Sequence, residues 1–148
     1  MTRASAQALQ MIVAEPPPGY RMLRPMVVDC SVLCALLFQE PERDEAEIRL
    51  SGHALNAPGL LDYEIANVAS KKQARGNPGL VEHALGLYAA LPIRLHGCEL
   101  RPVCELAERY ELSAYDAAYL WLAASLKAPL ATFDRKLGEA ARRHLSEL

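Results

Sequence analysis

The chain has only four cysteines in 148 residues, and none belongs to a Cys-x-x-Cys pair. With only four histidines besides, no spacing typical of a zinc site is present. This pattern excludes a zinc-stabilised module and gives no sign of a disulfide framework. We expect reduced, mostly buried thiols in a cytosolic protein, at Cys30, Cys34, Cys98 and Cys104.

Long hydrophobic runs are also missing. The longest run near the start covers residues 11–14, which is far shorter than the about 7–15 residues of a signal-peptide core or the about 20 of a spanning helix. We therefore expect a soluble, cytoplasmic protein.

The charge balance shows no basic excess: 16 Lys and Arg stand against 18 Asp and Glu, a formal net charge of −2. This balance argues against a protein that binds nucleic acid through a broad basic surface. It is compatible with a local basic rim around an acidic centre. The chain does have 51% hydrophobic residues, enough for the core of one domain of ordinary size.

The first 25 residues differ in composition from the rest. They hold three arginines, one glutamate and the run PPPGY, which cannot continue a helix or a central strand. We predict that residues 1–25 form a flexible extension, or lie upstream of the true start with Met26 as the first residue. A single domain is predicted over residues 26–148.

From residue 26 onward, short apolar runs alternate with helical periods, which is typical of βα units around a mostly parallel sheet. Strands are predicted at residues 26–29, 54–58, 93–96 and 128–134. Helices are predicted at residues 31–39, 41–50, 60–75, 78–90, 98–111, 113–127 and 135–145. The fold class is therefore α/β.

Two aspartates follow predicted strands. Asp29 ends the first strand and Asp134 ends the last, and the carboxyl ends of parallel strands form the edge where ligands bind. Each aspartate could instead simply cap the helix that follows it, since Asp is a favoured capping residue. Two acids at one sheet edge favour a site more than either does alone.

Two further acids lie on predicted helices. Ser113 and Asp116 form an S-x-x-D pattern, a variant of the capping box, yet Asp116 also shares a helix face with Tyr119 and Leu120. Glu64 borders the apolar face of its helix, and taken alone it is better explained as a surface residue.

Four carboxylates gathered in a low-dielectric cleft would repel one another strongly. A hard divalent cation removes this repulsion, because Mg²⁺ and Mn²⁺ prefer oxygen ligands. Such a metal polarises a phosphoryl oxygen and generates a hydroxide-like nucleophile. The acids therefore predict metal-dependent phosphodiester hydrolysis.

Four segments resemble the PIN-domain ribonucleases, in particular the VapC-type toxins of bacterial toxin–antitoxin modules. These are MVVDCSVLCALLFQEPE, PGLLDYEIANVASK, ALPIRLH and LSAYDAAYLWLAASLKAPLATFDRKL. The resemblance covers nearly all of residues 26–145 in the right order. It rests on the joint presence of the D-x-S, E-x-x-N-V, S-x-x-D-A-x-Y-L-x-L-A and T-x-D motifs.

The resemblance implies a three-layer α/β/α fold with a central, mostly parallel sheet of four to five strands. It also implies an Mg²⁺- or Mn²⁺-dependent endoribonuclease acting on tRNA or another structured RNA, a homodimer, and a cognate VapB-like antitoxin. The family's catalytic and metal-binding acids fall on Asp29, Glu64, Asp116 and Asp134, and its supporting residues on Ser31, Thr132 and Asn67.

Basic side chains near these acids are candidates for contact with RNA phosphates. They are Arg135 and Lys136, directly after Asp134, and Lys71, Lys72 and Arg75, toward the end of the Glu64 helix. Each is individually also explained as part of a solvated helix surface.

Other interpretations fit less well. A haloacid-dehalogenase-type phosphatase needs a second Asp where Ser31 stands, and a receiver domain needs a Lys where Asp134 stands. DNA-cutting relatives of this fold generally need longer chains with helical arches. The remaining alternative is a non-catalytic PIN-like module that binds RNA or protein.

Overall fold

The computed structural model describes residues 22–148, so most of the predicted N-terminal extension, including the PPPGY run, lies outside the described residues. The first strand begins at Arg24, two residues earlier than the sequence predicted. None of the helices within residues 22–148 is both long enough and apolar enough to cross a membrane.

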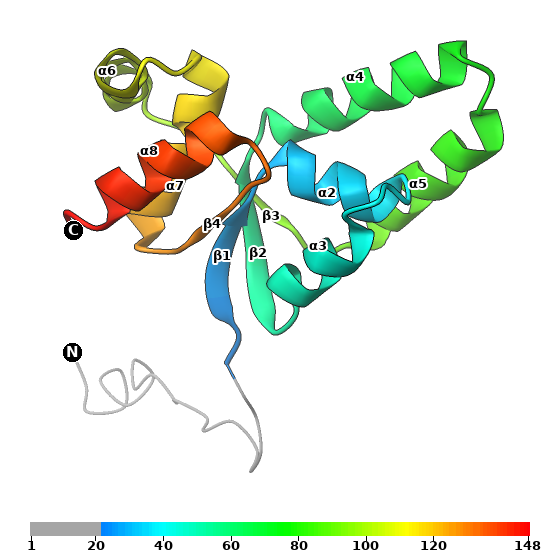
Figure 1. Ribbon diagram of the computed structural model, residues 1–148, viewed down its shortest axis with the longest axis horizontal. Coiled ribbons are helices and arrows are strands. Elements are labelled where there is room, and N and C mark those ends of the chain that lie inside the picture. Colours follow the sequence, from blue (N-terminus) through cyan, green and yellow to red (C-terminus); the bar gives the residue numbers. More distant parts are fainter. Residues whose placement is uncertain (1–21) are drawn as a thin grey trace, which may run out of the picture.

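The centre of the protein is a four-stranded parallel sheet in the order β3-β2-β1-β4 (Figure 1). Its strands are β1 (Arg24–Val28), β2 (His53–Pro58), β3 (Arg94–His96) and β4 (Leu130–Ala131). The inner strand β1 ends in three apolar residues that are all buried, as expected for a strand covered on both faces. The predicted parallel sheet is confirmed, with four strands in the described part of the chain.

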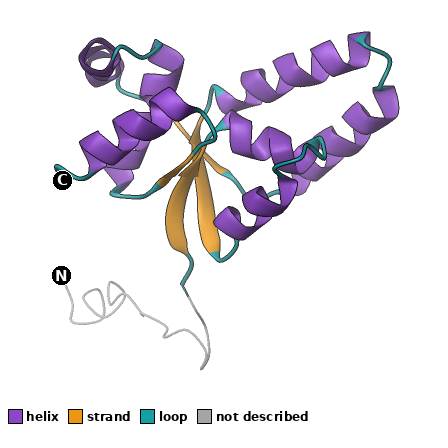
Figure 2. Ribbon diagram, in the orientation of Figure 1, coloured by secondary structure: helices purple, strands orange, loops and turns teal. Residues whose placement is uncertain are grey.

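Helices cover both faces of the sheet (Figure 2). On one side lie α2 (Cys30–Leu37), α3 (Arg43–Leu50), α4 (Leu61–Ala74) and α5 (Pro78–Ala90). On the other lie α6 (Leu100–Tyr110), α7 (Ala114–Leu126) and α8 (Arg135–Leu145). This is the three-layer α/β/α arrangement that the resemblance implied.

Helix α7 packs directly against β1, β2 and β4. It can lie close to the strands because alanines fill much of its buried face, with Tyr119, Leu120 and Leu122 as the large buried side chains. The helix begins after the cap Ser113 and ends at Lys127, whose backbone is left-handed at φ 49°. This packing fixes the start of α7 beside the carboxyl ends of the strands.

The helices match their predicted ranges to within about two residues at each end, but the last strand is much shorter than the predicted run of residues 128–134. Only Leu130 and Ala131 pair with β1. Beyond them the backbone turns away. The Thr132 hydroxyl donates to Asp29 at the end of β1 and accepts the backbone N–H of Asp134. The chain thus leaves the sheet just where its polar residues begin.

The cysteines are free, as predicted. The expectation that they are mostly buried is wrong, because only Cys34 is fully buried and Cys104 is exposed. Cys104 lies on the outer helix α6, whose buried stripe is formed by other side chains. Cys30 and Cys34 lie one turn apart on α2 with their Sγ atoms 3.4 Å apart.

Candidate active site

Asp29 lies at the carboxyl end of β1, where it caps the N-terminus of α2. Its carboxylate is almost fully buried, with 6% of the residue exposed. Oδ1 accepts hydrogen bonds from the backbone N–H of Ser31 at 2.9 Å and from the Ser31 hydroxyl at 2.5 Å. Oδ2 accepts a 2.6 Å hydrogen bond from the hydroxyl of Thr132. The capping interpretation of this residue is confirmed, and the same carboxylate also accepts a hydrogen bond from a residue that follows β4.

The hydroxyls of Ser31 and Thr132 link the end of β1 to the loop after β4. Ser31 Oγ accepts the N–H of Phe133 at 2.9 Å, and Thr132 Oγ1 accepts the N–H of Asp134 at 2.9 Å. Each hydroxyl thus accepts from a backbone amide and donates its proton to Asp29. This arrangement holds the Asp29 carboxylate in one orientation and ties Asp134 to it through the backbone.

Glu64 lies in the first turn of α4 and is half-buried. Its Oε1 accepts a 2.6 Å hydrogen bond from the hydroxyl of Tyr119 on α7. Tyr119 is 1% exposed, so its ring is part of the core while its hydroxyl reaches the site. Sequence analysis assigned Tyr119 to the apolar face only; its spacing of three residues from Asp116 was the one available sign of a role at the site.

Asp116 and Asp134 both lie at helix N-termini. The backbone N–H of Asp116 donates to the hydroxyl of Ser113 at 3.1 Å, so Ser113 is the cap of α7 and Asp116 lies in its first turn. Asp134 caps α8 by accepting the N–H of Leu137 at 2.8 Å. Asp116 is partly buried and Asp134 is exposed, so these two acids line the outer part of the cluster.

The carboxylates influence one another. Burial raises the pKa of Asp29, and the hydrogen bonds from Ser31 and Thr132 offset part of the rise. Burial also raises the pKa of Glu64, with further increases from the charges of Asp29 and Asp116. The pKa of Asp116 is raised by burial first and then by the charges of Asp134 and Asp29. All four predicted acids therefore belong to one electrostatic cluster.

The donor atoms of the cluster are carboxylate and hydroxyl oxygens, the ligands preferred by hard divalent cations. As the side chains stand in residues 22–148, no three acidic, His or Cys residues are arranged to hold a metal ion together. Asp29 and Glu64 are oriented by hydroxyl donors instead. The chemistry of the donor set fits Mg²⁺ or Mn²⁺, and ligation would require the carboxylates to turn toward a common point.

The model of the PIN domain family matches residues 26–143. The chain belongs to the PIN domain family. It is 31% identical over 121 residues to a protein named Ribonuclease VapC3 from Pyrobaculum aerophilum, covering 77% of this chain and 92% of that one. It is also 31% identical over 124 residues to VapC ribonuclease Mb0985 from Mycobacterium bovis, covering 79% and 91%.

A solved structure, that of PAE2754 from Pyrobaculum aerophilum, superposes on this PIN domain with a TM-score of 0.64 at 24% identity. The match covers 85% of this chain and 96% of the other. It supports the fold, and with the family match it confirms the resemblance on which the assignment of the acids depends.

The predicted basic residues of this PIN domain do not gather around the acids. Among them, only Lys136 acts on the cluster, where its charge lowers the pKa of Asp116. Arg135 pairs with Glu139 at 3.2 Å, and Lys72 pairs with Glu40 at 3.9 Å. Lys71 and Arg75 lie about 10 and 17 Å beyond Glu64 along the axis of α4, at about 1.5 Å per residue. Figure 1 shows this helix leading away from the sheet.

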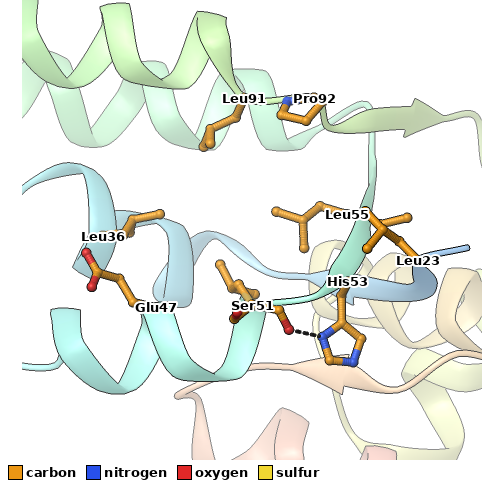
Figure 3. A pocket seen from close by; sticks show the side chains of 10 residues that line it. Leu23, Leu36, Glu47, Ser51, His53, Leu55, Leu91 and Pro92 are labelled. Atoms are coloured by element: carbon orange, nitrogen blue, oxygen red, sulfur yellow. Dashed lines mark hydrogen bonds between the residues drawn. The ribbon is translucent and has the colours of Figure 1, made fainter. Parts of the chain in front are cut away.

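The domain also has a pocket of about 570 Å³ at the amino ends of its strands, opposite to the ends that carry the acids (Figure 3). Its lining comes from residues that precede or begin strands, such as Leu23, His53, Leu91 and Pro92, and from the later parts of helices α2 and α3. His53 Nδ1 lies 3.0 Å from the carbonyl oxygen of Ser51. Because the strands are parallel, this pocket lies far from the acids that follow the strands, and none of the four lines it.

Proposed function

We propose that this protein is a metal-dependent endoribonuclease, the toxin of a VapBC-like toxin–antitoxin system. One observation carries the proposal. Four carboxylates from separate elements lie toward the carboxyl edge of the sheet. Burial raises the pKa values of three of them, and neighbouring carboxylates raise those of Glu64 and Asp116 further. Relatives that share about 31% of their residues with this chain bear the name VapC ribonuclease.

The electrostatic repulsion between the clustered carboxylates supports a metal cofactor, because a bound cation would offset it. Like charges held together without compensation destabilise a fold, and Lys136 is the one predicted cation that offsets them here. We assign Asp29, Asp116 and Asp134 as direct ligands of Mg²⁺ or Mn²⁺, and Glu64 to complete the shell or position the attacking water. When bound, the metal supplies Lewis-acid polarisation of the phosphoryl group and a water of lowered pKa.

The remaining residues prepare the site. Ser31 and Thr132 hold the Asp29 carboxylate through hydrogen bonds of 2.5 and 2.6 Å. Tyr119 holds Glu64 from the core side. Lys136, at the edge of the acidic cluster, is placed to attract the phosphate of an incoming strand.

The partners follow from the same assignment. We propose RNA as the substrate, with tRNA or another structured RNA as the preferred class. A VapB-like antitoxin is the proposed inhibitor and a homodimer the proposed assembly. We propose that the protein acts in the cytoplasm, where such RNA is found.

The test is incubation of the purified full-length protein, free of antitoxin, with total RNA and with purified tRNA. Mg²⁺, Mn²⁺ and excess chelator are compared, and Asp116→Asn is run beside the unaltered protein. Discrete fragments are expected with metal only, and none with the variant. Asp44→Asn is the matched control, because Asp44 is an exposed acid in the first turn of α3.

Intact RNA in every lane, from a folded protein that still binds RNA, would overturn the nuclease. It would favour the non-catalytic RNA-binding module, and the four acids would then need another explanation. Cleavage that survives excess chelator would overturn the metal dependence alone.

A further inference from the structure

A pocket of about 500 Å³ lies directly beside Glu64 and is not used by the proposed chemistry. Four of its five lining residues come from the start of α4: Leu60, Tyr63, Glu64 and Asn67. The fifth is Tyr115, in the first turn of α7. The pocket therefore lies between the two helices that also carry Glu64 and Asp116.

The residues from α4 form one face of that helix. Positions 60, 63, 64 and 67 follow the i, i+3, i+4, i+7 spacing, which places side chains in one row. Glu64 belongs both to this row and to the acidic cluster, and Tyr115 immediately precedes Asp116. The pocket is thus continuous with the predicted catalytic acids.

The two tyrosines are unusually open for aromatic residues. Tyr63 is 79% exposed and Tyr115 is 68% exposed. A single exposed aromatic residue on a protein surface needs no explanation. Here, however, one comes from each helix and both line the same pocket, together with the partly buried Leu60.

The chemistry of the lining residues limits the class of ligand that the pocket can bind. The five residues include no Lys, Arg or His, and they include one carboxylate. A phosphate group would be repelled here, whereas a flat, uncharged group can stack on tyrosine rings. The side chain of Asn67 is exposed and offers both a donor and an acceptor to such a group. An RNA nucleobase has this combination of properties.

We propose that this pocket binds one unpaired nucleobase of the RNA beside the scissile phosphodiester. The base stacks on Tyr63 and Tyr115, and the Asn67 amide contacts its edge. This inference rests on the proposed ribonuclease function and defines its substrate further. Because a paired base is not free to enter a pocket, the protein selects single-stranded loops over duplex RNA.

The test measures RNA binding separately from cleavage. A fluorescent RNA hairpin with a single-stranded loop is titrated with the full-length protein in chelator, and its anisotropy gives Kd. Tyr63→Ala and Tyr115→Ala are each expected to raise Kd roughly 5- to 150-fold, the range for loss of one stacked base. Tyr63→Phe and Tyr115→Phe keep the ring and are expected to stay within about 3-fold of the original.

The control variant is Leu100→Ala, which removes a side chain of similar exposure (78%) from α6. Hairpins with one abasic position in the loop complete the experiment. At the position that enters the pocket, the abasic hairpin is expected to bind the unaltered protein at least as weakly as the intact hairpin binds Tyr63→Ala. The same abasic change is expected to cost Tyr63→Ala less affinity than it costs the unaltered protein, because one of the two stacking rings is already absent from the variant.

Unchanged Kd in both alanine variants would overturn the base pocket, even if metal-dependent cleavage is intact. If the alanine variants bind RNA more weakly but neither they nor the unaltered protein cleave it, the base pocket is supported and the proposed nuclease function is wrong. Sedimentation equilibrium is run on each variant. If the alanine variants change the oligomeric state but not the RNA affinity, the pocket is an interface between copies of this chain and the proposal is wrong.

Discussion

Thr132 donates a 2.6 Å hydrogen bond to Asp29 across 103 positions of sequence, and the same Thr132 oxygen accepts the backbone N–H of Asp134. One hydroxyl therefore connects two of the four acids. Since Asp29 ends β1 and Asp134 caps α8, this hydroxyl sets the relative position of the first and last parts of the site.

Replacing that hydroxyl is expected to weaken the fold. Thr132→Val keeps the shape of the side chain but leaves the buried Asp29 with one donor fewer and the Asp134 N–H without its acceptor. We expect a loss of about 1–3 kcal/mol in the free energy of unfolding, measured by urea denaturation. Thr132→Ser retains the hydroxyl and is the control. Equal losses in both variants would show that the methyl group, and not the hydrogen bond, matters.

Tyr119→Phe removes the only hydroxyl donor recorded for Glu64 within residues 22–148. The ring stays in the core, so folding is expected to be unchanged. Cleavage of RNA is expected to fall on the order of 10-fold, as for other groups that orient metal ligands. Because the Tyr119 hydrogen bond lowers the pKa of Glu64, its loss raises that pKa and moves the acidic limb of the pH–rate profile to higher pH.

The control for Tyr119→Phe is Tyr110→Phe. The Tyr110 hydroxyl, at the end of α6, bonds to His144 on α8 at 3.0 Å. This variant loses a comparable hydrogen bond away from the acids. An equal fall in activity for both variants, with no shift of the acidic limb, would contradict a positioning role for Tyr119.

The raised pKa values also predict how stability depends on pH. Asp29, Glu64 and Asp116 bind protons more tightly in the folded chain than at their ordinary values of 3.8 or 4.5. Their contribution to stability is complete below those values and is lost as pH rises through the raised ones. In chelator, Asp116→Asn is therefore expected to be more stable than the unaltered protein near about pH 8, and this gap should close toward about pH 4.

Denaturation in urea across this range, with and without Mg²⁺, measures the gap. The metal is expected to stabilise the unaltered protein more than the variant, because it binds the folded state. A gap that does not change with pH would mean that neither burial nor the neighbouring carboxylates raise the pKa of Asp116.

The sequence was sufficient to predict the four strands, the order of the helices and three of the four acids, because each of these has a local sign. Glu64 is assigned only through the family resemblance and the presence of the other three acids. Asp29 and Asp134 follow apolar runs, and Asp116 lies three residues after a capping serine. The Tyr119–Glu64 bond had no such sign, since its partners are 55 positions apart and Tyr119 also fits the apolar face. Periodicity reports which face of a helix is buried, but not which atom at its edge finds a polar partner.

The same limit applies to the basic residues. Lys72 lies in the last turn of α4, the helix that carries Glu64, but its ammonium group pairs with Glu40 and lies 5.1 Å from the centre of the Phe38 ring. Proximity along the chain suggested a role in RNA binding, whereas the rise of the helix carries Lys71 and Arg75 away from the acids. Lys136 remains near them because it lies only two residues after Asp134.

The two interpretations of the S-x-x-D pattern can be separated by a pair of variants. Ser113→Ala removes the cap of α7, whose oxygen accepts the Asp116 N–H, and is expected to cost about 1 kcal/mol in the free energy of unfolding. It leaves the Asp116 carboxylate in place, so RNA cleavage should remain within a few-fold of the original. Asp116→Asn is expected to abolish cleavage while the folded state persists. If Asp116→Asn instead destabilises the protein, as Ser113→Ala is expected to do, the Asp116 carboxylate stabilises the helix and has no part in the reaction.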